Sequence, residues 1–456
     1  MKTFLFVFYL IGVFAVLLWC FKNNRRQISR KNESRNGSSG VFATNYITPI
    51  FVFSAAFIAY SSIGIFDRIG NEDVSLYDFF VFVVSNFVGL FFFVVGYGKN
   101  NSVTENNKLD LKSLFTNGDK TKGIRITGVV VFTTFLLVAL LNFAFVKSLV
   151  VNFGSGESYL DYSIRDERTA FGGLIQALKS YFHVLFLLWP FYRCYSKKRI
   201  GILEAIIVLL YFSWAFFSGD RTTLILIVIM FAVLINDRFK NFSMKFLIIA
   251  AIVGVLGLVM LGHLRRYSSI GEMIEMIQRY GITALIDVTG SGEFKYTTGT
   301  LFNYIVAIDS VFDYSFFGVY IVELIMFVPT FIFPNRPLPL AEQYMLDFFP
   351  SAPKGTGHGW YILTTGYMAM GILGIALEMF VFGKLVRGVY AKFFEGKISA
   401  IHAFLYSYFL LYLFYSVRSS MILSVKNYII NVLPVILIYL LLKKSFDSEA
   451  RKLYNE

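Results

Sequence analysis

The feature that most constrains this chain is a series of apolar runs, each long enough to cross a bilayer. The hydrocarbon core takes roughly 20 helical residues to cross, and eleven runs near that length alternate with polar segments. They cover residues 4–21, 47–66, 78–97, 126–146, 172–192, 200–217, 222–236, 245–262, 360–382, 400–417 and 427–442. The sequence therefore predicts an all-α polytopic membrane protein with about 11 transmembrane helices, within a range of roughly 10 to 14.

The composition excludes two other classes of protein. Hydrophobic residues make up 56% of the 456 residues and charged residues 16%, whereas roughly a quarter of an average soluble domain is charged. This balance excludes a soluble globular enzyme and a disordered chain. Cys20 and Cys194 stand at the ends of apolar runs without metal-ligand spacing, so we expect both to be reduced. No small-residue cleavage site follows the run 4–21, so we expect a retained span and not a signal peptide.

The formal net charge of +13 is distributed unevenly, and its distribution predicts the orientation. Cytoplasmic loops of membrane proteins carry an excess of Lys and Arg. Assigning the segments 22–46, 98–125, 193–199, 237–245, 383–399 and 443–456 to the cytoplasm places 27 Lys and Arg there against 9 Asp and Glu. The outer side then holds 14 Lys and Arg against 17 Asp and Glu. The N-terminus is therefore expected outside and the C-terminus inside, and the basic balance indicates no nucleic-acid partner.

The longest segment between spans, residues 263–359, lies on the outer side in this arrangement and must cross an even number of times. We expect the ambiguous apolar run 316–333 either to lie in the outer interface, which is the arrangement we favour, or to cross the membrane together with a weak segment near 299–315. Segments 272–286 and 301–312 carry apolar stripes typical of helices on a membrane surface. The chain thus divides into a bundle of about eight spans (1–262), a periplasmic or interfacial loop (263–359), and about three spans with a cytoplasmic tail (360–456).

Arginines at the edge of the outer face are the candidate substrate ligands. Guanidinium groups form bidentate hydrogen bonds with phosphate oxygens, and several of them together could hold a lipid diphosphate and stabilise it as a leaving group. The alternative for each is that it anchors the span end to lipid headgroups. The candidates are Arg221, Arg265, Arg266, Arg279, Arg336 and Arg418.

Two residues are candidates for a catalytic base. His358 lies in the Gly-rich stretch Gly-Thr-Gly-His-Gly-Trp, where backbone freedom allows close approach to a ligand. Glu293, in Gly-Ser-Gly-Glu-Phe, is the competing candidate. The sequence has no phosphate-binding Gly-x-x-x-x-Gly-Lys loop and no His-Glu-x-x-His pattern, so we expect neither ATP use nor a metal or other cofactor.

Three stretches carry a resemblance to a known family. Residues 218–222 read Ser-Gly-Asp-Arg-Thr, like a Gly-x-Arg turn that opens a mid-chain span. Residues 317–337 run from an aromatic-Gly pair through Pro329 to the turn Pro-Asn-Arg-Pro. Residues 355–374 pass from a Gly-rich turn to Tyr367 and the span segment Gly-Ile-Leu-Gly. With a similar hydropathy profile over nearly the whole chain, the sequence resembles the bacterial O-antigen polymerases, the Wzy-type polysaccharide polymerases.

This resemblance implies a GT-C-like polytopic glycosyltransferase of the bacterial inner membrane, working in lipopolysaccharide biosynthesis. Such an enzyme joins undecaprenyl-diphosphate-linked oligosaccharide repeat units at the periplasmic face, together with a chain-length regulator as partner. The resemblance assigns diphosphate and chain binding to Arg221, Arg265, Arg266 and Arg336, and the role of base to His358 or Glu293. Two alternatives stay open, an O-antigen ligase that transfers chains to lipid A-core and a flippase for the same lipid-linked unit.

Overall fold

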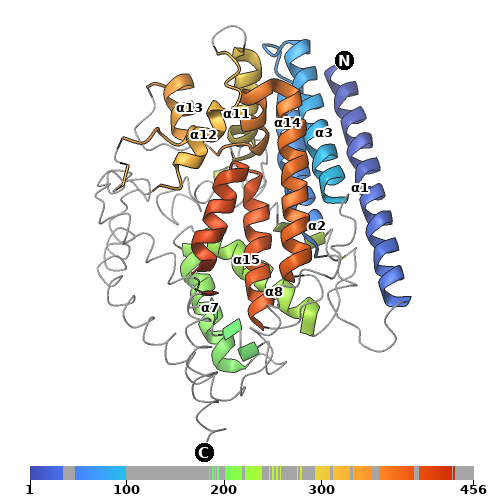
Figure 1. Ribbon diagram of the computed structural model, residues 1–456, viewed down its shortest axis with the longest axis vertical. Helices are drawn as coiled ribbons and strands as arrows, with labels where there is room; N and C mark the ends of the chain where they lie inside the picture. The colour runs from blue at the N-terminus through green and yellow to red at the C-terminus, as the bar shows by residue number, and fades with distance from the viewer. Residues whose placement is uncertain are drawn as a thin grey trace, which may run out of the picture.

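The computed structural model describes most of the N-terminal and C-terminal thirds of the chain (Figure 1). The described residues are 1–33, 47–98, 201–217, 221–238, 293–308, 312–328, 332–333, 335–351, 359–394, 400–433 and 435–436, with isolated helical residues within 184–194, 246–257 and 275–279. Every regular element in these ranges is a helix, because the apolar runs must satisfy their backbone groups internally.

Within the described ranges, four helices are long and apolar enough to cross a membrane. They are the apolar part Lys2–Trp19 of α1 (Lys2–Glu33), α2 (Pro49–Ile69), α3 (Leu76–Gly98), and α14 (Ile362–Val389) with its π-helical extension η4 (Tyr390–Phe394). An all-helical, membrane-embedded protein is therefore confirmed. The predicted runs 126–146, 172–192 and 245–262 lie wholly or largely outside the described residues, so the number of eleven spans stays a prediction.

Four shorter helices follow other predicted runs. Helices α7 (Ile202–Phe217), α8 (Arg221–Arg238) and α15 (Ala400–Ser416) match the runs 200–217, 222–236 and 400–417 closely. The apolar helix Met421–Leu433 begins six residues before the predicted run 427–442. Its earlier start places Lys426 inside a helix, although the sequence had assigned this residue to an outer loop.

The core of the described bundle is the contact between α3 and α14, where two glycines let the helix backbones approach closely. A Cβ atom on Gly96 would lie 3.0 Å from the Phe380 carbonyl carbon, and one on Gly383 would lie 2.9 Å from the Tyr97 nitrogen. Such small residues are the usual means of close helix packing in membranes. Next to them, the Phe53 ring of α2 packs at a tilt against the Phe93 ring, with centroids 4.0 Å apart.

Helix α14 is broken near its start, which the single predicted run 360–382 did not indicate. Met370 and Gly371 have non-helical backbone angles, and Gly371 has φ 61° and ψ −143°, a conformation that is essentially restricted to glycine. The break leaves the Met368 and Ala369 carbonyl groups without helical partners. The backbone N–H groups of Ser315 and Phe316 donate to them at 2.9 and 3.1 Å, which joins the segment before α12 to this break.

Helices α11 (Glu293–Ala307), α12 (Gly318–Ile325) and α13 (Leu340–Phe348) lie together at the end of the bundle that also holds the N-terminus (Figure 1). Helix α11 packs against α2, α3 and α14, so it is more deeply buried than the surface helix expected over 301–312. Helix α12 has only eight residues, or about 12 Å. It is too short to cross a bilayer by itself.

Segments that the charge distribution assigned to the outer side meet at this same end. The Lys2 ammonium group donates to the Asn71 carbonyl oxygen at 2.6 Å, and Lys295 pairs with Asp67 at 3.5 Å. Next to these outer segments, at the ends of the predicted spans 360–382 and 400–417, the Ile362 N–H group donates to the Val417 carbonyl at 3.2 Å. We call this end, with the loop 70–75, helices α11–α13 and the turn 417–420, the cap end. Which side of the membrane it faces stays a prediction.

Candidate functional site

The structure describes the side chains of only some of the predicted site residues. Arg265, Arg266 and His358 lie outside the described residues. Arg221 and Glu293 begin α8 and α11, but their side chains are not described. Arg279 is helical and exposed. The side-chain surroundings of the predicted site can therefore be followed only from Arg336 and Arg418.

Arg336 lies at the cap end beside a second cation that sequence reasoning missed. The half-buried Arg336 guanidinium donates to the Val328 carbonyl oxygen at 3.1 Å. The Lys426 ammonium group donates to the Met326 carbonyl oxygen, so both cations are held at the C-terminal end of α12. The carbonyl oxygens that hold the two cations belong to residues only two positions apart in the chain. Two like charges held this close repel each other, and an anion placed between them would relieve that repulsion.

Arg418 lies in the turn that follows α15, also at the cap end. Its backbone N–H group donates to the Tyr415 carbonyl at 3.0 Å, and its guanidinium carbon lies 5.8 Å from the centre of the Tyr415 ring. The side chain is half-buried. A cation over an aromatic face is held in place, so Arg418 is positioned by the protein and does not simply extend towards headgroups.

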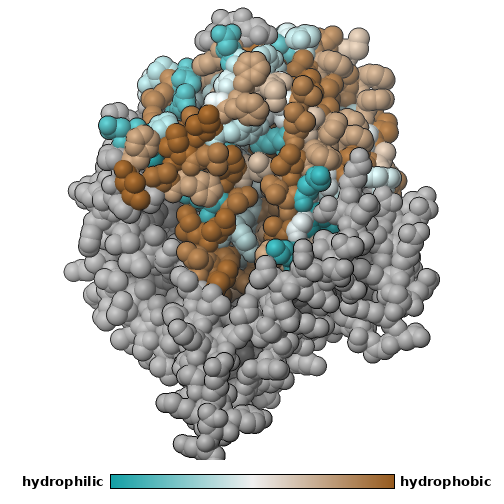
Figure 2. Space-filling view, viewed as in Figure 1, coloured by the Kyte–Doolittle hydropathy of each residue, from teal (hydrophilic) through white to brown (hydrophobic). Residues whose placement is uncertain are grey.

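Helix α12 is amphipathic and forms one wall of this region. On its inner face, the Tyr320 hydroxyl donates to Glu378 Oε2 at 3.1 Å, and Glu323 is hydrogen-bonded to the Ser420 hydroxyl. On its outer face, Phe317, Ile321 and Leu324 are more than half exposed. Figure 2 shows this hydrophobic surface continuing towards the helices below. The cation pair therefore lies at the border between a polar interior and an apolar, lipid-type surface.

Two buried carboxylates, Glu323 and Glu378, lie on the inner side of α12. Each is only 6% exposed. Burial raises the pKa of Glu323 to about 7, and the Ser420 hydrogen bond opposes that rise. Burial and the two carboxylates also raise the pKa of the Tyr320 hydroxyl. Sequence reasoning missed this pair because 55 residues separate its members, and only the packing of α12 on α14 brings them together.

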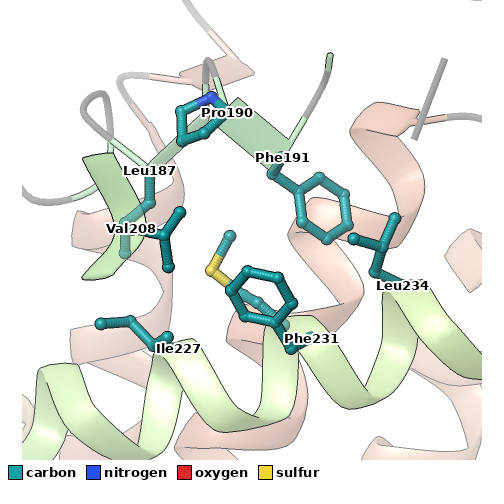
Figure 3. Close-up of a pocket in the computed structure, with 8 residues that line it drawn as sticks. Leu187, Pro190, Phe191, Val208, Ile227, Phe231 and Leu234 are labelled. Atoms are coloured by element: carbon teal, nitrogen blue, oxygen red, sulfur yellow. The ribbon is translucent and has the colours of Figure 1, made fainter. Parts of the chain in front are cut away.

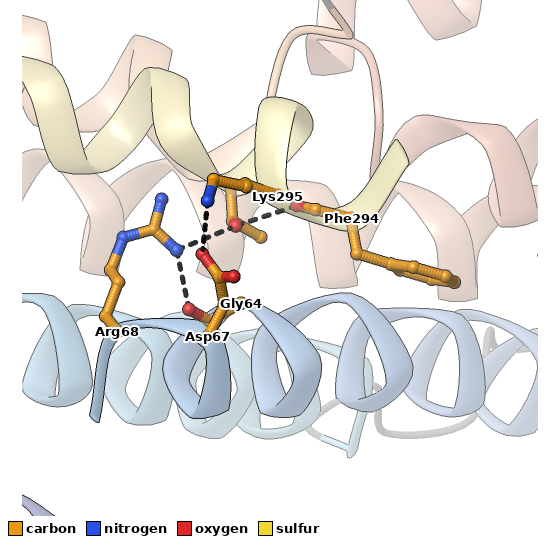
Figure 4. A network of polar contacts seen from close by, with 6 residues as sticks. Gly64, Asp67, Arg68, Phe294 and Lys295 are labelled. Carbon is orange, nitrogen blue, oxygen red and sulfur yellow. Dashed lines mark hydrogen bonds and ion pairs between the residues drawn. The ribbon is translucent and has the colours of Figure 1, made fainter. Parts of the chain in front are cut away.

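A further arginine at the cap end, Arg68, serves the fold. Its guanidinium donates to the Gly64 carbonyl and to the Thr298 hydroxyl, the latter at 3.4 Å (Figure 4). It also lies 4.9 Å from the ring centres of both Phe82 and Phe302. The side chain is only 6% exposed, and it is held by these two hydrogen bonds and two rings. Arg68 therefore joins α11 to α2 and α3, and the neighbouring Lys295–Asp67 pair supports the same junction.

A separate pocket lies between α7, α8 and the helical residues near 190 (Figure 3). Only apolar side chains line it: Leu187, Pro190, Phe191, Val208, Ile227, Met230, Phe231 and Leu234. Such a lining has no group that can orient a sugar or a phosphate. The pocket is therefore not a candidate for the chemistry, and the polar groups around α12 form the candidate functional site.

Comparisons with known proteins do not assign a family, since no family model, curated protein or solved structure matches the chain. In the described ranges there is also no group of three or more His, Cys, Asp or Glu side chains placed to hold a metal. The functional argument therefore rests on the residues around α12, which are Arg336, Lys426, Glu323, Glu378 and Tyr320.

Proposed function

We propose that this protein is a membrane glycosyltransferase that polymerises oligosaccharide units carried on undecaprenyl diphosphate, as the O-antigen polymerases do. The observation that carries the proposal is the Arg336–Lys426 pair at the C-terminal end of α12. A lipid diphosphate needs cations for its phosphates and an apolar surface for its tail. The pair supplies the first, and the exposed side chains Phe317, Ile321 and Leu324 supply the second.

The reaction would use the cation pair to stabilise the leaving group. A hydroxyl of the acceptor sugar attacks the anomeric carbon of the growing chain, and the bond between that carbon and the diphosphate oxygen breaks. The acceptor proton passes to a base, for which His358 and Glu293 remain the candidates. The departing lipid diphosphate gains negative charge, which Arg336 and Lys426 would stabilise most strongly where water is excluded.

The predicted topology places this reaction at the periplasmic face of the inner membrane, with the cap end outside. The GT-C-like arrangement, the eleven spans and a chain-length regulator as partner belong to the same proposal. It is supported by the meeting of the segments assigned to the outer side at one end of the described bundle.

Deletion of the gene tests the proposal through the surface lipopolysaccharide. Loss of a polymerase leaves core carrying a single repeat unit, whereas loss of a ligase or flippase leaves bare core. Complementation with Arg336→Ala or Lys426→Met should fail to restore the ladder at normal protein levels. Lys384→Met is the matched control, because Lys384 is an exposed lysine of α14 beside the Phe380 ring. Bare core in the deletion strain would overturn the proposal.

A second candidate, a flippase for the same lipid-linked unit, is favoured by one specific observation. Broken membrane helices and buried carboxylates are common features of transporter binding sites, and α14 has both in Gly371 and Glu378. A flippase would leave lipid-linked units on the cytoplasmic side when it is deleted. Deletion of a polymerase would instead leave single repeat units attached to the core. The deletion strain therefore separates the two candidates.

A further inference from the structure

The two buried carboxylates of the α12 region each keep one oxygen without a hydrogen-bond partner. In Glu378, Oε2 accepts from the Tyr320 hydroxyl, whereas Oε1 is buried and unpartnered. In Glu323, the carboxylate is hydrogen-bonded to Ser420, whereas Oε2 is buried and unpartnered. Each of the two helices therefore holds one carboxylate oxygen that is buried without a hydrogen-bond donor.

Neither carboxylate has an ion pair within the described part of the chain. The two cations of the site, Lys426 and Arg336, donate to the carbonyl oxygens of Met326 and Val328. A buried, unpaired carboxylate costs several kcal/mol in general, so such groups are protonated, paired or bound to a cation. Two of them side by side increase that cost, because the charge on each acts against the other.

A third bare oxygen lies on the helix Met421–Leu433. Ser424 is 5% exposed, and its hydroxyl is buried without a partner. It follows Ser420, the partner of Glu323, by four residues, and the Ser424 N–H group donates to the Ser420 carbonyl at 3.1 Å. Residues four apart share a helix face, so the Ser424 hydroxyl is on the side of the helix that meets Glu323.

We propose that Glu323 and Glu378 bind a divalent cation, Mg²⁺ or Ca²⁺, with the Ser424 hydroxyl as an additional ligand. Oxygen-only ligands select hard cations. The two negative charges balance a divalent ion, and Mg²⁺ commonly binds through one or two carboxylates while it keeps several waters. The ion would tie α12 to α14 beside the Arg336–Lys426 pair. This site goes beyond the proposed function and does not depend on it, since ion binding needs no sugar substrate.

The test uses the full-length protein in detergent, stripped with EDTA and desalted, without any lipid-linked substrate. Its thermal unfolding midpoint is measured with MgCl₂, CaCl₂ or NaCl at equal ionic strength, and bound metal is counted by mass spectrometry. We expect MgCl₂ or CaCl₂ to raise the midpoint, because an ion that binds only the folded state stabilises it, and NaCl to leave it unchanged. Glu323→Gln and Glu378→Gln should lose the response. Glu72→Gln, which removes an exposed carboxylate at the same end, should keep it.

Ser424→Ala keeps the inference testable if a glutamine variant fails to fold. This variant retains both carboxylates, and it should raise the metal concentration needed for half of the midpoint shift, by roughly tenfold for a lost ligand contact. A wild-type protein that responds to neither divalent ion, or equally to NaCl, would overturn the proposal. So would an unchanged response in both glutamine variants. Bare core in the deletion strain would overturn the proposed function but leave this result untouched, so the two proposals fail separately.

Discussion

Replacing Gly383 by alanine should weaken the contact between α3 and α14 more than the same change at any other glycine of α14. The added Cβ would lie 2.9 Å from the Tyr97 nitrogen and closer still to the Phe93 carbonyl oxygen. Ordinary contacts between heavy atoms lie at about 3.5 Å, so the backbones must separate by roughly 0.6 Å or more. Both neighbours are backbone atoms, and no side chain can rotate away to make room.

The magnitude follows from the cost of overpacking a close interface. Inserting a methyl group where the surroundings cannot adjust typically costs about 1–3 kcal/mol. Gly388 lies on the same helix, and a Cβ there would meet nothing within 4 Å. Alanine gains roughly 1 kcal/mol over glycine in helix propensity at either position. The difference between the two variants therefore isolates the steric cost, which we expect to be about 1–3 kcal/mol.

The assay is thermal or denaturant unfolding of Gly383→Ala and Gly388→Ala in the same detergent. Gly383→Ala should unfold at a clearly lower midpoint than Gly388→Ala, whose midpoint should equal or exceed that of the wild type. Equal midpoints for the two variants would refute the direct backbone contact between α3 and α14.

Three further predictions concern the break, a buried hydrogen bond and the topology. Gly371→Ala should destabilise by about 1–3 kcal/mol in an unfolding measurement, because φ 61° is unfavourable for alanine and its Cβ would lie 3.1 Å from the Tyr314 hydroxyl. Tyr361→Phe should lower the free energy of unfolding by about 1–3 kcal/mol, because the buried Asn86 side-chain oxygen loses the hydroxyl donor that lies 2.6 Å away. An unchanged unfolding midpoint would contradict this hydrogen bond. A protease-cleavable tag in the exposed loop 70–75 should be cut from the periplasm in intact spheroplasts, and protection of that tag would reverse the predicted orientation.

The sequence was sufficient to predict the position of those helices whose ends are marked by charged residues or glycine. The runs 47–66 and 78–97 correspond to α2 and α3 within a few residues, because an unbroken apolar stretch in a membrane has helix as its only open option. The same reasoning missed the break at Gly371, since a glycine inside an apolar run is also common in unbroken membrane helices.

The candidate site was harder to predict because its residues come together only through packing. Arg336 was expected from its place in the outer loop, but Lys426 was counted only as an orientation signal. Glu323 and Glu378 have no sequence spacing that relates them, and the hydrogen bond from Tyr320 that joins α12 to α14 reveals their neighbourhood. Arg68 illustrates the reverse case, a cation in a segment that the charge distribution assigned to the outer side but whose contacts hold helices together.

Reconstitution of the purified protein in liposomes tests the central claim most directly. The vesicles contain undecaprenyl-diphosphate-linked repeat units, and the products are separated by size. The proposed function predicts a ladder of lengthening chains together with free undecaprenyl diphosphate, and it predicts that Lys426→Met forms far less of both than Lys384→Met. Repeat units that cross the bilayer without growing, or that remain intact with active wild-type protein present, would contradict it.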